Sequence, residues 1–361
     1  MIKKICHMSS AHSVFDTRIF HKECKSLTKK YEVHLVCKYN KDECVDNIYI
    51  HGVRCENTNR YLRMTKVVYL VLKKALEIDA EVYHFHDPEL IPVGIYLLYK
   101  NKKVIYDVHE DYPAAILSKT WIPSIFRKTV SKIFKKIEEI VCPQFNNVIT
   151  VHEDIAVRLK SYKKNVTVLH NYPLAEISSE NIKKISEFVW LGGLSNIRGK
   201  KQIVEVFSTG KAKLNIIGKI EGGLNNNNNI NVCGSFPVSE AYNKAEKYFA
   251  GLVTYLPEPN HVNALPNKLF EYMALGIAVI ASDFPKWRKI IETAQCGILV
   301  DPENITSFKN AIKCMKENYQ ETIKMGENGR KAIRDHYRWE VEEQKLLEVY
   351  RELEYFEGVN K

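Results

Sequence analysis

The chain alternates short apolar runs with segments of helical pattern, and this alternation occurs twice. In the first half the predicted buried strands are Ile2–His7, Val33–Cys37, Val82–Phe85, Val104–Val108 and Val148–Val151. In the second half they are Phe188–Leu191, Leu214–Ile217, Gly251–Tyr255, Ala278–Ala281 and Gly297–Val300. Helix-like segments such as Thr17–Lys29 and Pro88–Lys100 separate successive strands, which is the order found in parallel sheets. We therefore predict an α/β chain with two Rossmann-like, doubly wound domains.

The domain boundary is predicted where the alternation restarts, after the polar stretch Ser178–Ser186. A chain of 361 residues is too long for one hydrophobic core, so two domains are expected. We assign residues 1–172 to the first domain, 173–337 to the second and 338–361 to a final amphipathic helix. The polar run Asn225–Asn229 is predicted to be a solvated loop.

Charge and cysteine content limit the classes of protein that the chain can represent. The net charge is +10, and residues 1–170 hold 28 Lys/Arg against 19 Asp/Glu, so nearly all the surplus lies in the first half. The nine cysteines form no CxxC pair, which argues against a disulfide framework or a zinc site. No apolar stretch is long enough to span a membrane, and the Lys3-Lys4 start does not resemble a signal peptide. We expect a cytoplasmic protein.

Polar residues directly after predicted strands are candidate site residues, because ligands of doubly wound domains bind at the carboxyl ends of the strands. His86 and Asp87 follow the third strand, while His109 and Glu110 follow the fourth. A histidine there can polarise a ligand hydroxyl, or it can simply be satisfied by the backbone. The spacing His84-x-His86 also allows a metal, but no third ligand is suitably spaced in the sequence. We predict no metal site.

The loop after the first strand offers a possible anion site. It contains His12, Asp16 and Arg18 but lacks GxGxxG, the dinucleotide fingerprint. His12 and Arg18 could hold an anionic group. Alternatively, Asp16 caps the following helix and Arg18 is a solvated residue of its first turn.

Two strand-to-helix turns in the second half carry cations. Gly192 and Gly193 let the backbone approach a ligand, and Arg198 with Lys200 and Lys201 can grip a phosphate. In the second turn Lys268 occupies the start of a helix, where a cation is locally unfavourable. An i,i+3 pair with Glu271 contributes only about 0.2–0.5 kcal/mol, which does not explain that placement. We predict a diphosphate held by the cations and a ribose held by the carboxylate.

The motifs together resemble a known family. The segments "SSAHSVFDTRIFHKECKSL", "HFHDPEL", "YDVHEDYP", "WLGGLSNIRGKKQIVEVF" and "VCGSF…ALPNKLFEYMALGIAVIASDFP" occur in the order typical of GT-B glycosyltransferases of family 4, in the branch that assembles bacterial surface polysaccharides. The resemblance covers nearly the whole chain. It implies a GT-B fold whose last helix packs back on the first domain, a nucleotide-sugar donor with UDP as the expected base, and retention of configuration without a metal or other cofactor.

The resemblance also implies roles for individual residues. Arg198 and Lys268 would stabilise the departing nucleoside diphosphate, Glu271 would bind the ribose, and His109 would contact the sugar near the reacting centre. Further donor contacts are expected from Gly192, Gly193, Lys201, Phe236, Asn263 and Leu269. Acceptor or anion contacts are expected from His12, Asp16, Arg18, His86, Asp87 and Glu110.

Two positions depart from the family pattern. Asn263 stands where the first Glu of a Glu-x7-Glu pattern is expected, and Gly192-Gly193 replaces the frequent Gly-Arg. The first change puts the identity of the donor sugar in question. The second places more of the phosphate binding on Arg198 and Lys268, with Lys200 or Lys201 as additional contacts. Either change could also mean an inactive homologue.

Residues 124–137 predict a basic amphipathic helix. Such a helix can pack on a core, or it can lie on anionic lipid, where a lipid-diphosphate-linked or glycan acceptor would be found. No nucleic-acid-binding module is visible, so we expect no nucleic-acid partner. Besides a transferase, two other functions remain open: a nucleotide-sugar epimerase of the same fold and a non-catalytic sugar-nucleotide-binding protein.

Overall fold

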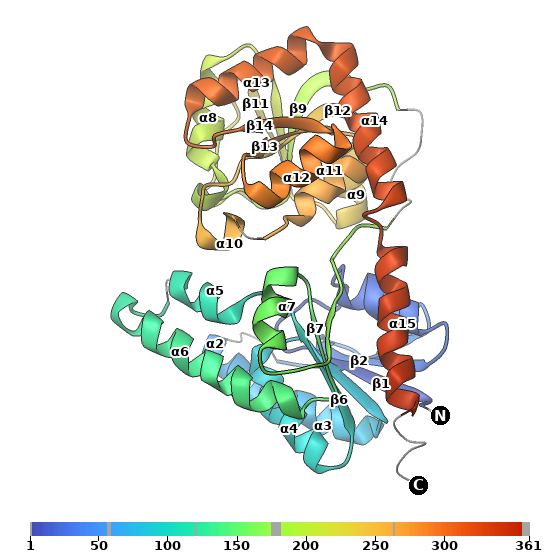
Figure 1. The fold of residues 1–361 in the computed structure, drawn as a ribbon. Helices are drawn as coiled ribbons and strands as arrows, with labels where there is room; N and C mark the ends of the chain where they lie inside the picture. Colours follow the sequence, from blue (N-terminus) through green and yellow to red (C-terminus); the bar gives the residue numbers. More distant parts are fainter. Residues whose placement is uncertain (1, 56–58, 120, 175–181, 263, 356–361) are drawn as a thin grey trace. The chain divides into compact units, whose positions relative to one another are not determined.

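A computed structural model describes residues 2–55, 59–119, 121–174, 182–262 and 264–355 (Figure 1). The chain divides into a first unit, Met1–Asn171 with Val341–Lys361, and a second unit, Tyr172–Glu340. The predicted boundaries lie within three residues of these. No helix among the described residues is long and apolar enough to cross a membrane.

The first unit contains an eight-stranded sheet with the order β3-β4-β2-β1-β5-β6-β7-β8. All neighbouring strands are parallel except β3 and β4. The strands are β1 (Lys4–Met8), β2 (Glu32–Lys38), β3 (Glu43–Val45), β4 (Ile48–Val53), β5 (Val82–Phe85), β6 (Lys103–Val108), β7 (Asn147–Thr150) and β8 (Val166–Val168). The sequence did not predict β3, β4 and β8, because these strands carry exposed or half-buried residues and lack a continuous apolar run.

Alternating residues of this sheet serve two different layers. Tyr83 and Phe85 of β5 join a hydrophobic cluster with residues of α3 (Val68–Ile78), α4 (Ile91–Tyr99) and α7 (Glu153–Lys160). His84, between them, faces the opposite layer, where it hydrogen-bonds Tyr350 of α15 (Trp339–Tyr355). Other helical segments are η1 (Ile19–Cys24), α1 (Lys25–Leu27), α2 (Arg60–Leu62), η2 (Arg63–Val67), η3 (Pro88–Leu90), α5 (Tyr112–Ser118), α6 (Ser124–Val141) and η4 (Cys142–Gln144).

The second unit is built on a six-stranded, fully parallel sheet with the order β11-β10-β9-β12-β13-β14. The strands are β9 (Ile185–Leu191), β10 (Leu214–Ile217), β11 (Ile230–Gly234), β12 (Tyr248–Val253), β13 (Ala278–Ser282) and β14 (Gly297–Val300). The helices are η5 (Asn196–Arg198), α8 (Lys200–Thr209), α9 (Val238–Ala245), α10 (Pro259–Val262), α11 (Asn267–Ala274), α12 (Pro285–Ala294), α13 (Ile305–Glu317) and α14 (Tyr319–Asp335). The run Asn225–Asn229 is a loop, as predicted. The half-exposed edge strand β11 was not predicted.

Both sheets reverse their strand order at one place. In the first unit the reversal lies between β1 and β5, and in the second between β9 and β12. Connections leave such a pair of strands in opposite directions, which opens a crevice at their carboxyl ends. The residues that follow these four strands are therefore the best-placed candidates for binding or chemistry.

Tyr272 of α11 attaches this helix to the central strand of the second sheet. Its hydroxyl accepts a hydrogen bond from the Leu191 backbone and donates one to Val189, at 2.8 and 3.1 Å. Its ring lies directly over Gly251, where an added Cβ would be 2.7 Å from ring carbons. The absence of a side chain at position 251 thus lets α11 approach β9 and β12 closely.

We predict that Gly251→Ala lowers the free energy of unfolding of the second unit by about 1–3 kcal/mol, because the methyl group overlaps a fully buried ring. Urea unfolding measures this. Gly223→Ala is the control, since its methyl group meets nothing within 4 Å and only the φ of +70° is strained. An equal or larger loss in the control would contradict this explanation.

Candidate active site

The turn after β9 brings backbone close to backbone. Gly192 has a φ of +86°, and a Cβ at Gly218 would lie only 2.2 Å from the Gly192 carbonyl oxygen. The indole N–H of Trp190 donates to the same oxygen at 3.0 Å. These contacts hold the Gly192-Gly193 turn tightly at the strand reversal, while the approach of a ligand to these glycines stays a prediction.

The two predicted cations meet beside this turn. The Arg198 guanidinium donates to the Gly193 carbonyl at 2.9 Å and lies 5.6 Å from the Tyr255 ring. The ammonium of Lys268 lies 3.4 Å from the centre of the Trp190 ring and 5.6 Å from that of Tyr255. The segment after β9 and the start of α11 therefore meet at Tyr255, which follows β12, although the three segments are far apart in sequence.

Lys268 is the least satisfied charge of this group. Its side chain is buried, and its ammonium has no hydrogen-bond partner among the described residues. Burial lowers the pKa of Lys268 well below its usual value, Arg198 lowers it further, and Glu271 opposes them. The neighbouring start of α11 has no side-chain cap and no acidic residue in its first turn. An anion bound here would satisfy both the lysine and the helix N-terminus.

The other predicted donor residues differ in their surroundings. Glu271 lies one turn along α11 and is hydrogen-bonded by Tyr242; burial, the charge of Glu271 and this bond raise the pKa of Tyr242. Phe236 is half-buried beneath the ammonium of Lys244, at 4.5 Å, and Lys201 is exposed at the start of α8. Asn263 lies outside the described residues.

The prediction of a donor contact by Leu269 needs correction. Its side chain is fully buried in the hydrophobic core of the second unit, and its backbone N–H donates to Pro266. Leu269 therefore supports α11 from inside and has no side-chain atom available to a ligand.

In the first unit, Arg18 lies at the centre of a buried ionic network. Its guanidinium donates to both oxygens of Asp107 at 3.0 and 3.1 Å and to the Leu169 carbonyl at 2.9 Å, and it pairs with Glu23 at 2.9 Å. Although burial opposes it, the charge of Arg18 and bonds from His109 and His86 hold the pKa of Asp107 well below its usual range. Burial raises the pKa of Glu23, and the charge of Arg18 opposes this shift.

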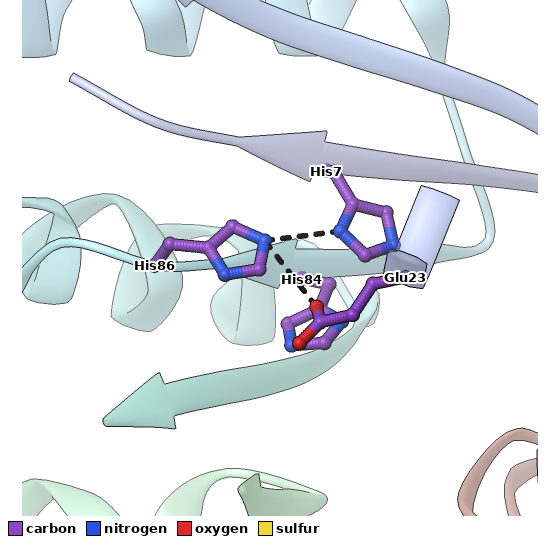
Figure 2. Close-up of side chains that lie close together, drawn as sticks. All are labelled: His7, Glu23, His84 and His86. Atoms are coloured by element: carbon purple, nitrogen blue, oxygen red, sulfur yellow. Dashed lines mark hydrogen bonds and ion pairs between the residues drawn. The ribbon is translucent and has the colours of Figure 1, made fainter. Parts of the chain in front are cut away.

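A group of buried histidines adjoins this network. Figure 2 shows His7, His84, His86 and Glu23 gathered around one nitrogen of His86, which lies 3.0 Å from His7 and 4.0 Å from Glu23. Desolvation lowers the pKa of His7 and His84 well below the usual value and that of His86 to about 4. These three imidazoles are therefore neutral at pH 7.

The structure corrects our argument that His84-x-His86 has no further ligand. His7, Glu23, His84 and His86 form one group, and His86, Asp107 and His109 another, whose nitrogen and oxygen atoms lie within 4.8 Å of one another. The additional residues come from β1, η1 and β6, so sequence spacing could not reveal them. Because Arg18 already supplies a positive charge to Glu23 and Asp107, we derive no step through a metal ion.

Two predicted acceptor residues are also corrected. Arg18 and His86 are buried, and their polar groups are committed to internal partners, so neither can contact an acceptor directly. Asp87 is likewise buried; it accepts from Ser9 and the backbone of Ser10, and it pairs with His12 at 3.1 Å. Against the opposing effect of burial, these contacts lower its pKa.

The remaining residues of this set lie nearer the surface. Asp16 accepts hydrogen bonds from the backbone N–H groups of Arg18 and Ile19, so it caps the helical segment that follows, as the second interpretation of this loop predicted. His12 and His109 lie ring to ring, with centroids 4.8 Å apart, and Glu110 pairs with Lys119. His12 and His109 thus remain the candidates for direct contact with a substrate.

Sequence reasoning did not single out several residues of both groups. Glu23 and Asp107 lie in apparently ordinary helix and strand patterns, and Tyr350 lies more than 300 residues from His7. Trp190 and Tyr255, which flank Lys268, read as core aromatics. The only usable signal was Asp107, a charge inside the otherwise apolar strand Lys103–Val108.

Two family matches together cover most of the chain. Residues 17–172 match the family described as Glycosyltransferase Family 4, and residues 179–332 match Glycosyl transferases group 1. No curated protein matches the sequence significantly. With two Rossmann-like parallel-sheet domains, the protein is of the GT-B class. The chain belongs to the glycosyltransferases of family 4 type.

Solved structures of the same fold agree over nearly the full length. Sucrose-phosphate synthase from Thermosynechococcus elongatus is 14% identical with a TM-score of 0.75, covering 97% of this chain and 99% of that one. Anabaena Alr3699/HepE, in complex with UDP and glucose, is 13% identical with a TM-score of 0.70, covering 97% and 100%. Trehalose 6-phosphate synthase from Burkholderia multivorans is 11% identical with a TM-score of 0.68, covering 99% and 98%.

We predict that the first unit loses stability as the pH falls from about 6.5 to 4. The unfolded chain binds protons at His86 in this range while the folded chain does not, because its folded pKa is lowered to about 4. That shift corresponds to about 3 kcal/mol. Urea unfolding at each pH measures the loss, and hydrogen exchange of the β1 and β5 amides measures it within the first unit. His86→Gln should flatten the pH dependence; an unchanged slope would contradict the assignment.

Proposed function

We propose that the protein transfers a sugar, with retention of configuration, from a UDP-linked donor to a glycan or lipid-linked acceptor in cell-surface polysaccharide synthesis. The observation that carries this proposal is Lys268, a buried cation that lies beside Arg198 and the uncapped start of α11 and has no hydrogen-bond partner in the part of the chain that the structure describes. A diphosphate is the ligand that satisfies all three groups. The complex of Alr3699/HepE with UDP and glucose supports a uridine nucleotide as donor.

The same groups account for catalysis without a metal. As the bond between sugar and phosphate breaks, negative charge grows on the diphosphate, and Arg198 and Lys268 stabilise that charge. Glu271 is placed one turn further along α11 to accept hydrogen bonds from ribose hydroxyls. We propose that the acceptor attacks on the face that the diphosphate leaves, through a short-lived oxocarbenium ion.

Lys268→Met should have two opposite effects. Removing a buried, unpaired charge should raise the melting temperature of the free protein, because the desolvation cost disappears. UDP affinity should fall by about 10- to 100-fold, because a charge-assisted contact is lost. A thermal-shift assay with and without UDP measures both the melting temperature and the UDP affinity. Lys289→Met, at an exposed lysine, is the control.

Unchanged UDP affinity in Lys268→Met would contradict the proposed donor site. Incubation of the protein with the donor alone, without an acceptor, distinguishes a transferase from an epimerase. Slow hydrolysis of the donor is expected from a transferase, whereas an isomerised sugar would identify an epimerase. A protein that binds UDP but shows neither reaction with any acceptor would be the non-catalytic homologue.

Helix α6 supports a membrane-bound acceptor. Phe134 and Val141 of this helix pack against the core of the unit, so part of the apolar stripe is core-packed, while another part is exposed. Its exposed apolar residues are Ile125 (79%), Phe126 (56%), Ile133 (55%), Ile137 (39%) and Ile140 (57%). Exposed Lys128, Lys132, Lys135 and Lys136 accompany them. We propose that this face lies on anionic lipid at the inner side of the plasma membrane.

Flotation with vesicles of anionic and of zwitterionic lipid tests this surface. Binding to anionic vesicles should weaken at least tenfold in Phe126→Gln/Ile133→Gln and in Lys132→Gln/Lys135→Gln, because apolar area or about 1 kcal/mol per lysine is lost. Val157→Gln is the matched control, since Val157 is 71% exposed on α7 of the same unit. Equal binding to both kinds of vesicle, or none at low salt, would overturn the membrane proposal.

A further inference from the structure

The buried histidines of the first unit form a hydrogen-bonded chain that ends at His109. The Nδ1 atom of His84 lies 3.0 Å from the Tyr350 hydroxyl, which lies 3.2 Å from Nε2 of His7. Nδ1 of His7 lies 3.0 Å from Nε2 of His86, whose Nδ1 lies 3.3 Å from Oδ2 of Asp107. The Nε2 atom of His109 lies 2.9 Å from the same carboxylate oxygen.

The protons of this chain can be placed from its acceptor end. Asp107 is ionised and can only accept, so the nitrogen closest to it, Nε2 of His109, carries a proton. Nδ1 of His86 lies 3.1 Å from this Nε2 and therefore accepts from it, so the proton of His86 lies on Nε2. His86 then donates from Nε2 to Nδ1 of His7, Nε2 of His7 donates to the Tyr350 oxygen, and the Tyr350 hydroxyl donates to Nδ1 of His84 (Figure 2 shows the His7–His86 contact). Each of these contacts pairs one donor with one acceptor, and Nε2 of His84, at the end of the chain, has no partner among the described residues.

The same rule fixes the tautomer of His109. If its proton were on Nδ1, the lone pair of Nε2 would face a buried carboxylate oxygen at 2.9 Å, an arrangement that costs the desolvation of both groups. The proton therefore lies on Nε2. The remaining nitrogen, Nδ1, is an acceptor, and no described residue hydrogen-bonds it.

We propose that Asp107, held by Arg18, is a positioning residue that fixes the Nε2–H tautomer of His109 and so presents Nδ1 to the substrate as a hydrogen-bond acceptor. The ligand group it fits is a hydroxyl, which must donate; a carbonyl or phosphate oxygen would be repelled. This identification of the hydroxyl as one belonging to a sugar rests on the proposed function. The tautomer itself does not.

The wild-type protein tests the tautomer without substrate. Long-range proton–nitrogen NMR of histidine-labelled protein should show a protonated Nε2 and an unprotonated Nδ1 for His109, assigned by the signal lost in His109→Gln. Tyr350→Phe, which removes a hydrogen bond elsewhere in the chain, should leave this pattern unchanged. Asp107→Leu should replace it by a mixture of tautomers, with Arg18 still paired to Glu23. A proton on Nδ1 in the wild type would overturn the proposal.

Activity tests which nitrogen meets the substrate. The side-chain amide of His109→Asn lies near the position of Nδ1, whereas that of His109→Gln lies near Nε2. Sugar transfer by the Asn variant should be at least about tenfold faster in kcat than transfer by the Gln variant, with similar donor KM. A faster Gln variant would contradict the assigned contact. Absence of transfer in the wild type would instead count against the proposed function, while the NMR result stands separately.

Discussion

Each unit depends on one constraint: a parallel sheet whose strand order reverses must bring polar residues together at the carboxyl ends of two neighbouring strands. In the first unit the reversal between β1 and β5 places His7 beside His84 in the strand register. In the second, the reversal between β9 and β12 places the Gly192-Gly193 turn near Tyr255, with Lys268 and Arg198 around it. The topology of each sheet therefore determines which residues lie together at its site.

The two units satisfy their buried charges differently. In the first, the cation Arg18 is ion-paired to Asp107 and Glu23 inside the unit. In the second, Lys268 rests on aromatic faces and has no hydrogen-bond acceptor among the described residues. A paired charge can hold a residue such as His109 in place, whereas an unpaired one can bind a ligand. This difference assigns support to the first group and donor binding to the second.

The sequence predicted what short-range rules control. Strand-to-helix alternation gave two parallel-sheet units, and the cation at the start of a helix pointed to Lys268 before its neighbours were known. Long-range partners could not be predicted: Arg18 was expected to hold an anionic group or to be a solvated first-turn residue, because nothing local shows that it lies beside Asp107, 89 positions away. The family resemblance implied a ligand contact for Leu269, but its side chain lies in the core. Asn263 lies outside the described residues, so its effect on the donor sugar stays a prediction.

The central claim is that a diphosphate binds beside Lys268 and reverses the lowering of its pKa that burial causes in the free protein. Calorimetry of UDP binding at pH 8.5, in buffers of different ionisation enthalpy, measures the protons taken up. Because burial lowers the pKa of Lys268 in the free protein and a diphosphate would raise it again, the account predicts proton uptake in the wild type that Lys268→Met lacks. Equal proton uptake in both proteins, or none in the wild type, would contradict it.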